Sequence, residues 1–267
     1  MGLTPRAIVR RLSAHPLPVY PESVSGIRTL LLGLVAALAA CDSQDGRSTC
    51  DVETSALRVV ALAVENGSTF RAEVDFSSDA DGLGVSLALC DDDVLTIDGD
   101  EALRVDRPDR IIYAHTSDVT TPRTIQIALS RKDDAPVEFI LEMPPSFEVV
   151  APQAGADVSR SSEFVLEWAP ANPGDSMRIE LAEEIGKGVC LETIQAEHDY
   201  KGLSGVDIED DGNWLVPANA VDGRPRDKCE ATYRFTRTHE SAYPAAFAPG
   251  GRVAGRIERR VAFVSVP

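Results

Sequence analysis

Carboxylates are the residues of this sequence whose types and spacing are best suited to chemistry. One cluster spans residues 91–101, and a second contains Asp207, Glu209 and Asp211 before a turn glycine. Ca²⁺ takes about six to eight oxygen ligands, and carboxylates that flank a turn can supply several. The second cluster fails the EF-hand pattern, because Ala218 stands where the loop needs a final Glu. We therefore expect a solvated acidic loop, with a calcium site as the alternative.

Local signatures of catalysis are missing from the sequence. His115, His198 and His239 each lack a neighbouring metal ligand at i+2 or i+4, and no G-x-S-x-G, H-E-x-x-H or glycine-rich phosphate loop is present. A catalytic pair of carboxylates is defined by its separation in space, which spacing along the chain does not give. We expect a non-enzymatic protein without a cofactor, with a carboxylate-based hydrolase as the alternative.

An uncharged apolar segment near the N-terminus predicts export. Residues 29–40 (TLLLGLVAALAA) follow Arg28 and contain no charged side chain. A helix of this length spans roughly 18 Å, whereas the hydrocarbon core of a bilayer is ~30 Å thick. The segment therefore fits the apolar core of a signal peptide better than it fits a membrane span.

The apolar segment ends in Leu38-Ala39-Ala40-Cys41, which resembles the lipobox of bacterial lipoproteins. The resemblance implies a diacylglyceryl thioether on Cys41 and cleavage before it, so residues 1–40 are the expected signal peptide. Two or three acyl chains anchor a protein stably. We expect a mature chain that is lipid-anchored to a bacterial membrane in the cell envelope and faces the periplasm or the exterior. Asp42 resembles an inner-membrane retention signal of enterobacteria, but other lineages read this position differently.

Charge is distributed unevenly along the chain. The formal net charge is -17, which disfavours nucleic acid as a partner because such a chain repels polyphosphate. Residues 222–267 nevertheless hold nine basic and five acidic residues. One hypothesis is that this basic edge docks on an acidic partner or on the first domain; the expected alternative is that its arginines occupy outward positions of strands. These arginines include Arg234, Arg237, Arg252, Arg256, Arg259 and Arg260.

Short alternating runs separated by turn residues predict an all-β protein. In 70–76 the apolar residues occupy every second position, which places them on one face of a strand. The strands expected in the first half are Ala56–Val64, Ser68–Phe76, Gly84–Cys90, Val94–Ile97, Arg110–His115, Thr124–Ser130 and Val137–Met143. Those expected in the second half are Phe147–Val150, Glu163–Trp168, Met177–Ala182, Val189–Ile194, Trp214–Val216, Ala231–Thr236 and Arg252–Val266.

Consecutive prolines at 144–145 mark the best domain boundary, because they cannot sustain a sheet ladder. We expect a tether over 41–49 and two immunoglobulin-like β-sandwich domains over 50–143 and 147–267. The opening of the second, Val150-Ala-Pro152 followed by Phe164-Val-Leu-Glu-Trp168, resembles a fibronectin type III domain. The resemblance implies that Trp168 is the core tryptophan and Tyr233 the tyrosine of a later strand. It implies a fold and no particular function.

Four cysteines besides Cys41 indicate disulfides in an exported chain, although four cysteines allow three connectivities. Pairing Cys50 with Cys90 and Cys190 with Cys229 keeps each bridge inside one expected domain. Each loop would contribute roughly 4 kcal/mol in the chain-entropy model. Buried free thiols are an alternative, whereas a zinc site is disfavoured because no C-x-x-C pair is present.

These observations together predict a non-enzymatic envelope lipoprotein that displays binding or structural surfaces for a protein or glycan partner. An accessory subunit of an envelope complex is the alternative within the same compartment.

Overall fold

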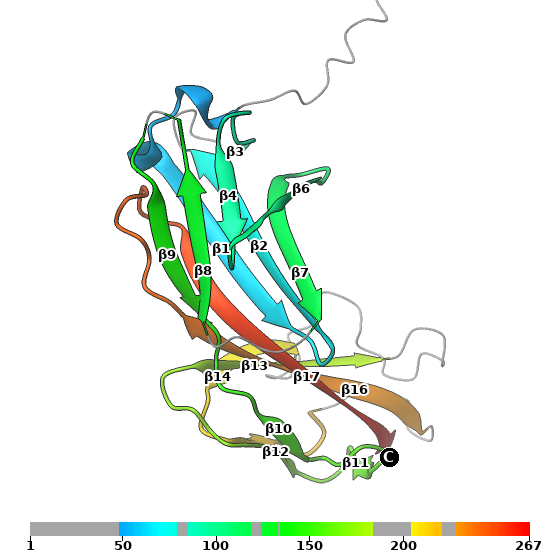
Figure 1. Ribbon diagram of the computed structural model, residues 1–267. Coiled ribbons are helices and arrows are strands. Elements are labelled where there is room, and N and C mark those ends of the chain that lie inside the picture. The colour runs from blue at the N-terminus through cyan, green and yellow to red at the C-terminus, as the bar shows by residue number, and fades with distance from the viewer. Residues whose placement is uncertain (1–47, 79–84, 119–123, 133, 184–203, 221–227) are drawn as a thin grey trace, which may run out of the picture. The chain divides into compact units, whose positions relative to one another are not determined.

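The computed structural model describes residues 48–78, 85–118, 124–132, 134–183, 204–220 and 228–267, and in this part the chain is all-β (Figure 1). Two single-turn 3-10 helices, η1 (Thr49–Asp51) and η2 (Thr54–Ala56), precede the first strand. The chain divides into Met1–Ser43 and the compact unit Gln44–Pro267, and every described residue belongs to the latter. The expected signal peptide and Cys41 lie outside the described residues. No described helix is long and apolar enough to cross a membrane.

One large sheet of ten strands organises the described chain. Its main path is β14 (Ser204–Glu209), β13 (Ser176–Glu183), β16 (Cys229–Glu240), β17 (Arg252–Val266), β1 (Leu57–Glu65), β2 (Thr69–Ser78), β7 (Ile111–Asp118) and β6 (Leu103–Asp106). Two short strands complete it: β11 (Asp157–Ser159) pairs with β17, and β3 (Val85–Ser86) pairs with β2.

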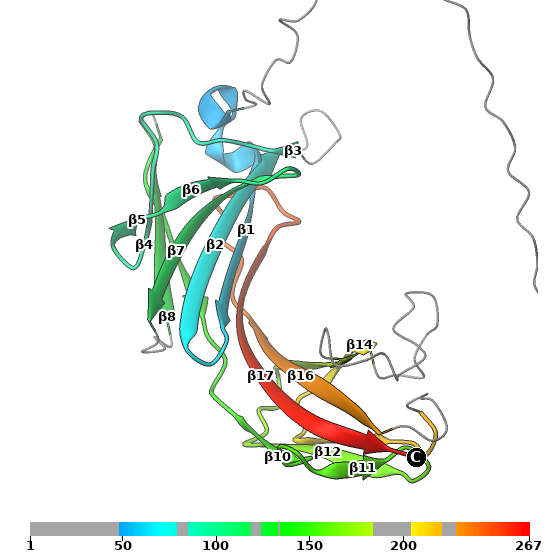
Figure 2. The same cartoon turned by 90° about the vertical axis from the view of Figure 1, so that its right-hand side faces the viewer.

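Two smaller sheets cover the two ends of the large one. The first has the order β5 (Asp100–Glu101), β4 (Val94–Ile97), β8 (Thr124–Ser130) and β9 (Val137–Glu142). The second has the order β10 (Glu148–Ala151), β12 (Phe164–Ala169) and β15 (Asn213–Val216). Figure 2 shows the first sheet opposite β1, β2 and β7, and the second opposite β16 and β17. A hydrophobic core lies between the layers in both halves.

The predicted all-β class is confirmed, and most expected strands are present within one or two residues of their expected ends. Expected strand Gly84–Cys90 is wrong in length, because in its described part the strand is Val85–Ser86, followed by one further backbone bond from Leu87 N to the Phe76 carbonyl oxygen. Beyond it, Leu89 N donates to the Tyr113 hydroxyl instead of to a neighbouring strand. Expected strand Val189–Ile194 lies outside the described residues. Four short edge strands were not predicted: β5, β6, β11 and β14.

The two aromatic residues singled out by the fibronectin resemblance lie in the core of the second half. Trp168 is 2% exposed and Tyr233 is fully buried. The Tyr233 ring stacks on Phe263 at 4.8 Å between centroids, and Trp168 packs against Phe235 at 5.9 Å. These contacts bring β12, β16 and β17 together across the two layers.

The C-terminal strand β17 belongs to both halves of the described chain. Its first six residues, Arg252–Ile257, pair in parallel with Val60–Glu65 of β1. The stretch 254–265 pairs antiparallel with β16, and 264–266 pairs in parallel with β11. The ranges 50–143 and 147–267 are therefore joined by one continuous sheet.

At Gly255, β17 passes close to the end of β9. A Cβ atom at Gly255 would lie 2.3 Å from the Glu142 carbonyl oxygen and 2.8 Å from the Met143 Cα. Both neighbours are backbone atoms, which cannot swing aside as a long side chain can. Glycine is therefore required here by the close approach of two chain segments.

A buried ion pair fixes the proline segment between the halves. Arg237 and Asp210 are both fully buried, and Arg237 Nε lies 2.5 Å from Asp210 Oδ2. Arg237 also donates to the carbonyl oxygens of Pro145 at 2.9 Å and Pro170 at 2.5 Å. Its guanidinium carbon lies 4.6 Å from the centroid of the Phe147 ring. The Arg237 side chain thus binds the proline segment between the halves, the residue that follows β12 and the turn after β14.

Two other side chains of the second half reach the first half. Arg259 Nη2 lies 2.8 Å from the buried carboxylate of Glu65, and Arg259 Nε donates to the Phe147 carbonyl oxygen at 3.2 Å. His239 lies between Asp175, at 2.7 Å, and Glu142 of β9, at 3.3 Å. The halves are therefore connected by side chains as well as by the shared sheet.

We predict that Gly255→Ala destabilises the protein by about 1–3 kcal/mol, because the added methyl group overlaps backbone atoms of β9. The free energy of unfolding in urea measures the effect. Ala262→Ser, which adds one atom at an exposed position of the same strand, is the control and should change stability by less than about 0.5 kcal/mol. Equal stabilities for the two variants would contradict the close approach.

We predict that Arg237→Met lowers the free energy of unfolding by about 3–5 kcal/mol, because it leaves the buried Asp210 carboxylate without its cation. Arg234→Met is the matched control on the same strand. It makes the same exchange at a side chain that is 40% exposed, so the loss should stay below about 1 kcal/mol. If the two variants lost comparable free energies of unfolding, the buried pair would contribute no more to stability than an exposed one.

Candidate functional site

A polar groove on the outer face of β13, β14, β16 and β17 is the candidate binding site. Its volume is about 400 Å³, and four arginines, three carboxylates and three hydroxyl side chains line it. This face of the sheet is turned away from β10 and β12 (Figure 2). The lining residues are Ser176, Arg178, Glu180, Asp207, Arg234, Thr236, Thr238, Arg252, Arg256 and Glu258.

Strand register explains why a hollow forms at this place. Ser176 of β13 is opposite Thr238 of β16, which is opposite Arg256 of β17. Alternate residues of a strand point to the same face, so long charged side chains stand on either side of this row. We infer that the short hydroxyl side chains of Ser176 and Thr238 form the floor of the groove, and that the longer charged side chains form its walls.

Three of the four arginines in the groove are held by carboxylates. Arg178 lies 3.4 Å from Glu180 and 3.2 Å from Asp207. Arg234 Nε donates to Glu180 at 2.6 Å. Arg252 Nε donates to Glu240 at 2.8 Å. Such pairs between half-exposed side chains contribute little to stability, but they fix the positions of the charges.

Arg256 differs from these three. Its Nε is buried and has no hydrogen-bond partner in the described part of the chain. Burial, and after it the charge of Arg252, lower the pKa of Arg256 below its ordinary value. The guanidinium stays protonated at neutral pH, because an arginine does not lose its proton in proteins. The groove thus contains a cation with donor capacity that described residues do not use.

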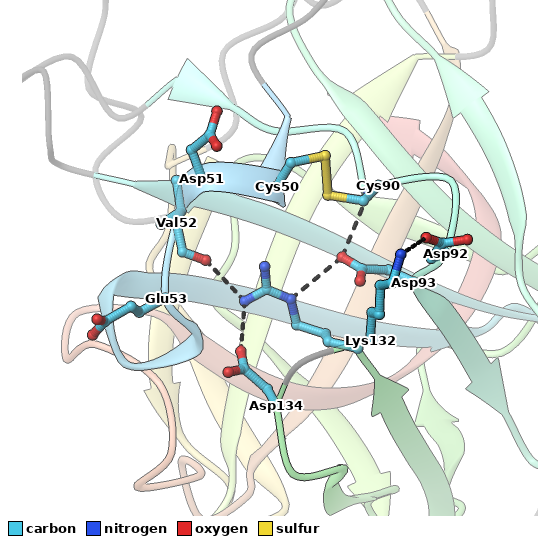
Figure 3. A pocket seen from close by; sticks show the side chains of 10 residues that line it. Cys50, Asp51, Val52, Glu53, Cys90, Asp92, Asp93, Lys132 and Asp134 are labelled. Carbon is cyan, nitrogen blue, oxygen red and sulfur yellow. Dashed lines mark hydrogen bonds and ion pairs between the residues drawn. A yellow bond between two sulfur atoms is a disulfide. The ribbon is translucent and has the colours of Figure 1, made fainter.

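A second hollow, of about 390 Å³, lies beside the Cys50–Cys90 disulfide (Figure 3). Arg131 is one of the residues that line it, with a side chain only 9% exposed. The guanidinium donates to the carbonyl oxygens of Thr49 at 2.6 Å and Val52 at 2.8 Å, and it pairs with Asp93 at 3.3 Å. Because its donors are engaged within the protein, Arg131 fastens the N-terminal segment to the loops of the first half.

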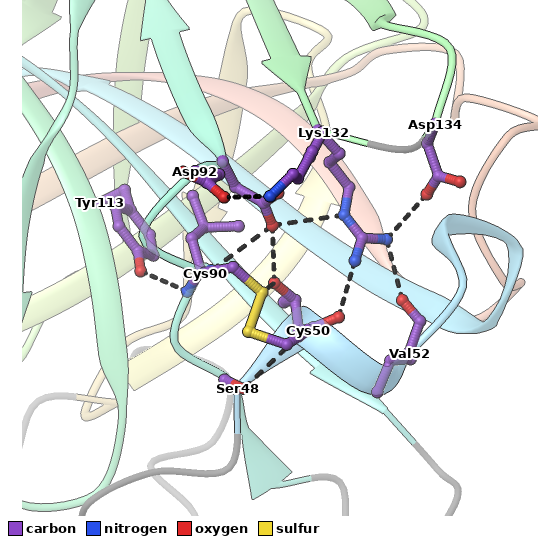
Figure 4. Close-up of a disulfide and its surroundings, with 12 residues drawn as sticks. Ser48, Cys50, Val52, Cys90, Asp92, Tyr113, Lys132 and Asp134 are labelled. Atoms are coloured by element: carbon purple, nitrogen blue, oxygen red, sulfur yellow. Dashed lines mark hydrogen bonds and ion pairs between the residues drawn. A yellow bond between two sulfur atoms is a disulfide. The ribbon is translucent and has the colours of Figure 1, made fainter.

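The predicted disulfide between Cys50 and Cys90 is present (Figure 4). Cys229 is also disulfide-bonded, while its expected partner Cys190 lies outside the described residues. Arg160 Nη1 lies 3.3 Å from the Cys229 sulfur atom. The pairing of Cys190 with Cys229 stays a prediction.

The acidic residues considered for calcium are not gathered into a metal site. Asp207 pairs with Arg178, and Asp211 Oδ1 accepts a hydrogen bond from Asn213 N at 3.3 Å. Among residues the structure describes, no group of three or more His, Cys, Asp or Glu side chains is arranged to hold a metal ion. Glu209 ends β14, opposite Ser176 in the ladder. In the first cluster, Asp93 pairs with Arg131.

The arginines of the basic edge divide into two groups. Arg234, Arg252, Arg256 and Arg260 point outward, as expected for polar positions of strands, and the first three line the groove. Arg237 and Arg259 point inward, so the expectation that all of these arginines face solvent is wrong for them. Arg259 pairs with Glu65 in the first half, and docking of the basic edge on an acidic partner stays a hypothesis.

Sequence reasoning missed the hydroxyl residues of the groove. Thr236 and Thr238 are themselves buried, and burial does not alternate over 235–238 of β16, so no simple pattern marks them. Ser176 lies 62 positions from Thr238 along the chain, and nothing local indicates that the two are opposite.

Neither the protein-family models nor the curated proteins compared with this chain contain a match. Among solved structures, the chain is similar to the crystal structure of DIP-gamma IG1+IG2, with 8% sequence identity and a TM-score of 0.23. The alignment covers 79% of this chain and 98% of that chain. A likeness this distant carries no argument about function, so the site must be interpreted from its own geometry.

We predict that Asp134→Asn destabilises the protein at neutral pH and has a diminishing effect in acid. The Thr54 hydroxyl donates to Asp134 at 2.5 Å, and this bond, followed by the Arg131 charge, lowers the pKa of Asp134. Stability from the carboxylate is therefore present above the unfolded pKa of about 3.9 and is lost as pH falls through the lower folded value.

Melting temperatures of both proteins between about pH 7 and about pH 2 test this prediction. The gap between wild type and Asp134→Asn should close in acid, and in a Thr54→Val background it should already be smaller at neutral pH. A gap that does not change with pH would rule out the proposed role of the carboxylate.

Proposed function

We propose that this chain is a non-enzymatic, lipid-anchored binding protein of the bacterial cell envelope that presents the arginine-lined groove to a protein partner. The observation that carries the proposal is the Arg256 guanidinium, which lines a groove of four arginines and three carboxylates and forms no ion pair with a described residue. In a chain with a net charge of -17, an arginine that no described carboxylate pairs with is a place where an anionic group is attracted.

Two immunoglobulin-like sandwich domains are part of the proposal. Immunoglobulin-type sandwiches place the first, second and fifth strands in one sheet and the third, sixth and seventh in the other. In the second half, β10, β12 and β15 face a sheet in which β13, β16 and β17 are neighbours. This order supports an immunoglobulin-like second domain of the fibronectin type III kind. The first half supports a sandwich through its two layers, with β17 as a shared strand.

The lipobox supports the proposed location. Cleavage before Cys41 would leave only a short segment between the lipid and Ser48, where the described chain begins. From η1 onward the chain is fastened by the Cys50–Cys90 disulfide and by Arg131. A folded domain would therefore start within a few residues of the membrane surface.

We predict that the wild-type protein incorporates a palmitate analogue and sediments with membranes, whereas Cys41→Ser does neither, because it lacks the thiol that carries the lipid. Metabolic labelling followed by membrane fractionation measures both properties. Ser43→Ala is the control, because it changes a residue just outside the lipobox, leaves Cys41 intact and should leave the labelling unchanged. An unlabelled, soluble wild-type protein would contradict the anchor.

In the same cells, a photo-cross-linking residue tests the binding role of the groove. At Ser176, on the floor of the groove, we expect a covalent adduct with a protein partner. At Gln126, on the exposed side of β8, we expect none. Identical adducts at the two positions, or none at either, would remove the groove from the proposal.

A further inference from the structure

We propose that the groove recognises a carboxylate side chain in an acidic peptide segment of the partner, and that Arg256 is the residue that binds this carboxylate. The inference rests on the proposed binding function and adds the chemistry of the ligand.

Arg256 has the geometry for this role. It stands opposite Thr238 in the ladder between β16 and β17, and directly opposite residues have Cβ atoms about 4.5–5.5 Å apart. A guanidinium binds a carboxylate through two parallel N–H donors; for Arg256 these are the donors of its two Nη groups, because Nε is buried. An adjacent hydroxyl can donate a third hydrogen bond. Ser176 continues the same row and offers another hydroxyl. The row therefore presents one cation and two neutral donors to a bound carboxylate.

The surrounding charges favour a singly charged ligand group. Glu180, Asp207 and Glu258 line the same groove, and each is already paired with an arginine other than Arg256. A phosphate, with a charge near -2, would be attracted to Arg256 but repelled by three carboxylates close by. A carboxylate carries a single negative charge, which balances the single positive charge of the unpaired Arg256. The groove thus favours carboxylate over phosphate.

The remaining side chains favour a peptide over an acidic glycan. None of the residues that line the groove is aromatic. Sugar rings have an apolar face that protein sites cover with aromatic side chains, and the groove offers no such platform. Instead, its carboxylates provide acceptors for amide N–H groups and for basic side chains next to the bound acid. A peptide segment supplies both.

Selection from a phage library of random heptapeptides tests the proposal on the full-length protein in detergent. Peptides selected on wild type should be enriched in Asp and Glu, and Arg256→Gln should abolish this enrichment. Arg104→Gln is the control, because Arg104 is an arginine of β6 in the first half that neither lines the groove nor pairs with a residue that does. Replacing the enriched Glu by Gln in a selected peptide should weaken its affinity at least about tenfold.

A stability measurement separates binding from a structural role. Because Arg256 Nε has no partner among the described residues, Arg256→Gln should unfold at the same urea concentration as wild type or at a higher one. A large loss of stability would overturn the assignment of Arg256 as a binding residue.

The remaining outcomes distinguish the inference from the proposed function. Selection of peptides without acidic residues overturns the inference. Binding of oligogalacturonate or of inorganic phosphate that depends on Arg256 also overturns it, yet leaves a binding groove in place. Absence of any selected peptide or bound anion, together with no cross-link at Ser176, overturns both.

Discussion

The ion pair between Arg237 and Asp210 is the interaction on which the described structure most depends. Moving two charges out of water costs several kcal/mol for each ion, so the pair is stable only if its remaining donors and acceptors find partners. Asp210 accepts a hydrogen bond from the Trp168 indole, and Arg237 donates to the carbonyl oxygens of Pro145 and Pro170. The buried Arg237 guanidinium thereby fixes the proline segment between the halves, β12 and the turn after β14 relative to β16.

The position of β16 in turn determines the groove. Arg237 points inward between Thr236 and Thr238, so the two hydroxyl residues point outward. Pairing with β13 on one side and β17 on the other then brings Ser176 and Arg256 into the same row as Thr238. The inner face of β16 is thus held by the contacts of Arg237, and its outer face contributes residues to the groove.

Local pattern predicts much of the fold and little of the site. Alternation of apolar residues located β1, β2, β8 and β17, because one face of each is buried. The shared sheet was beyond such reasoning, since the parallel pairing of β17 with β1 joins residues almost 200 positions apart. The inward arginines were missed for a related reason. Arg237 is buried and Arg259 is partly buried, and each is tolerated there because a carboxylate from another segment pairs with it.

The parallel pairing of β17 with β1 determines how the described chain would resist a pulling force. Suppose that the chain is held at its N-terminal end, before β1, and pulled at its C-terminal end, after β17. The force then draws β1 toward its start and β17 toward its finish. Because the two strands run in the same direction, they slide past one another in shear, and the hydrogen bonds between Val60–Glu65 and Arg252–Ile257 share the load instead of opening one by one. This connection between the halves is thus in its mechanically strongest orientation when tension runs along the chain.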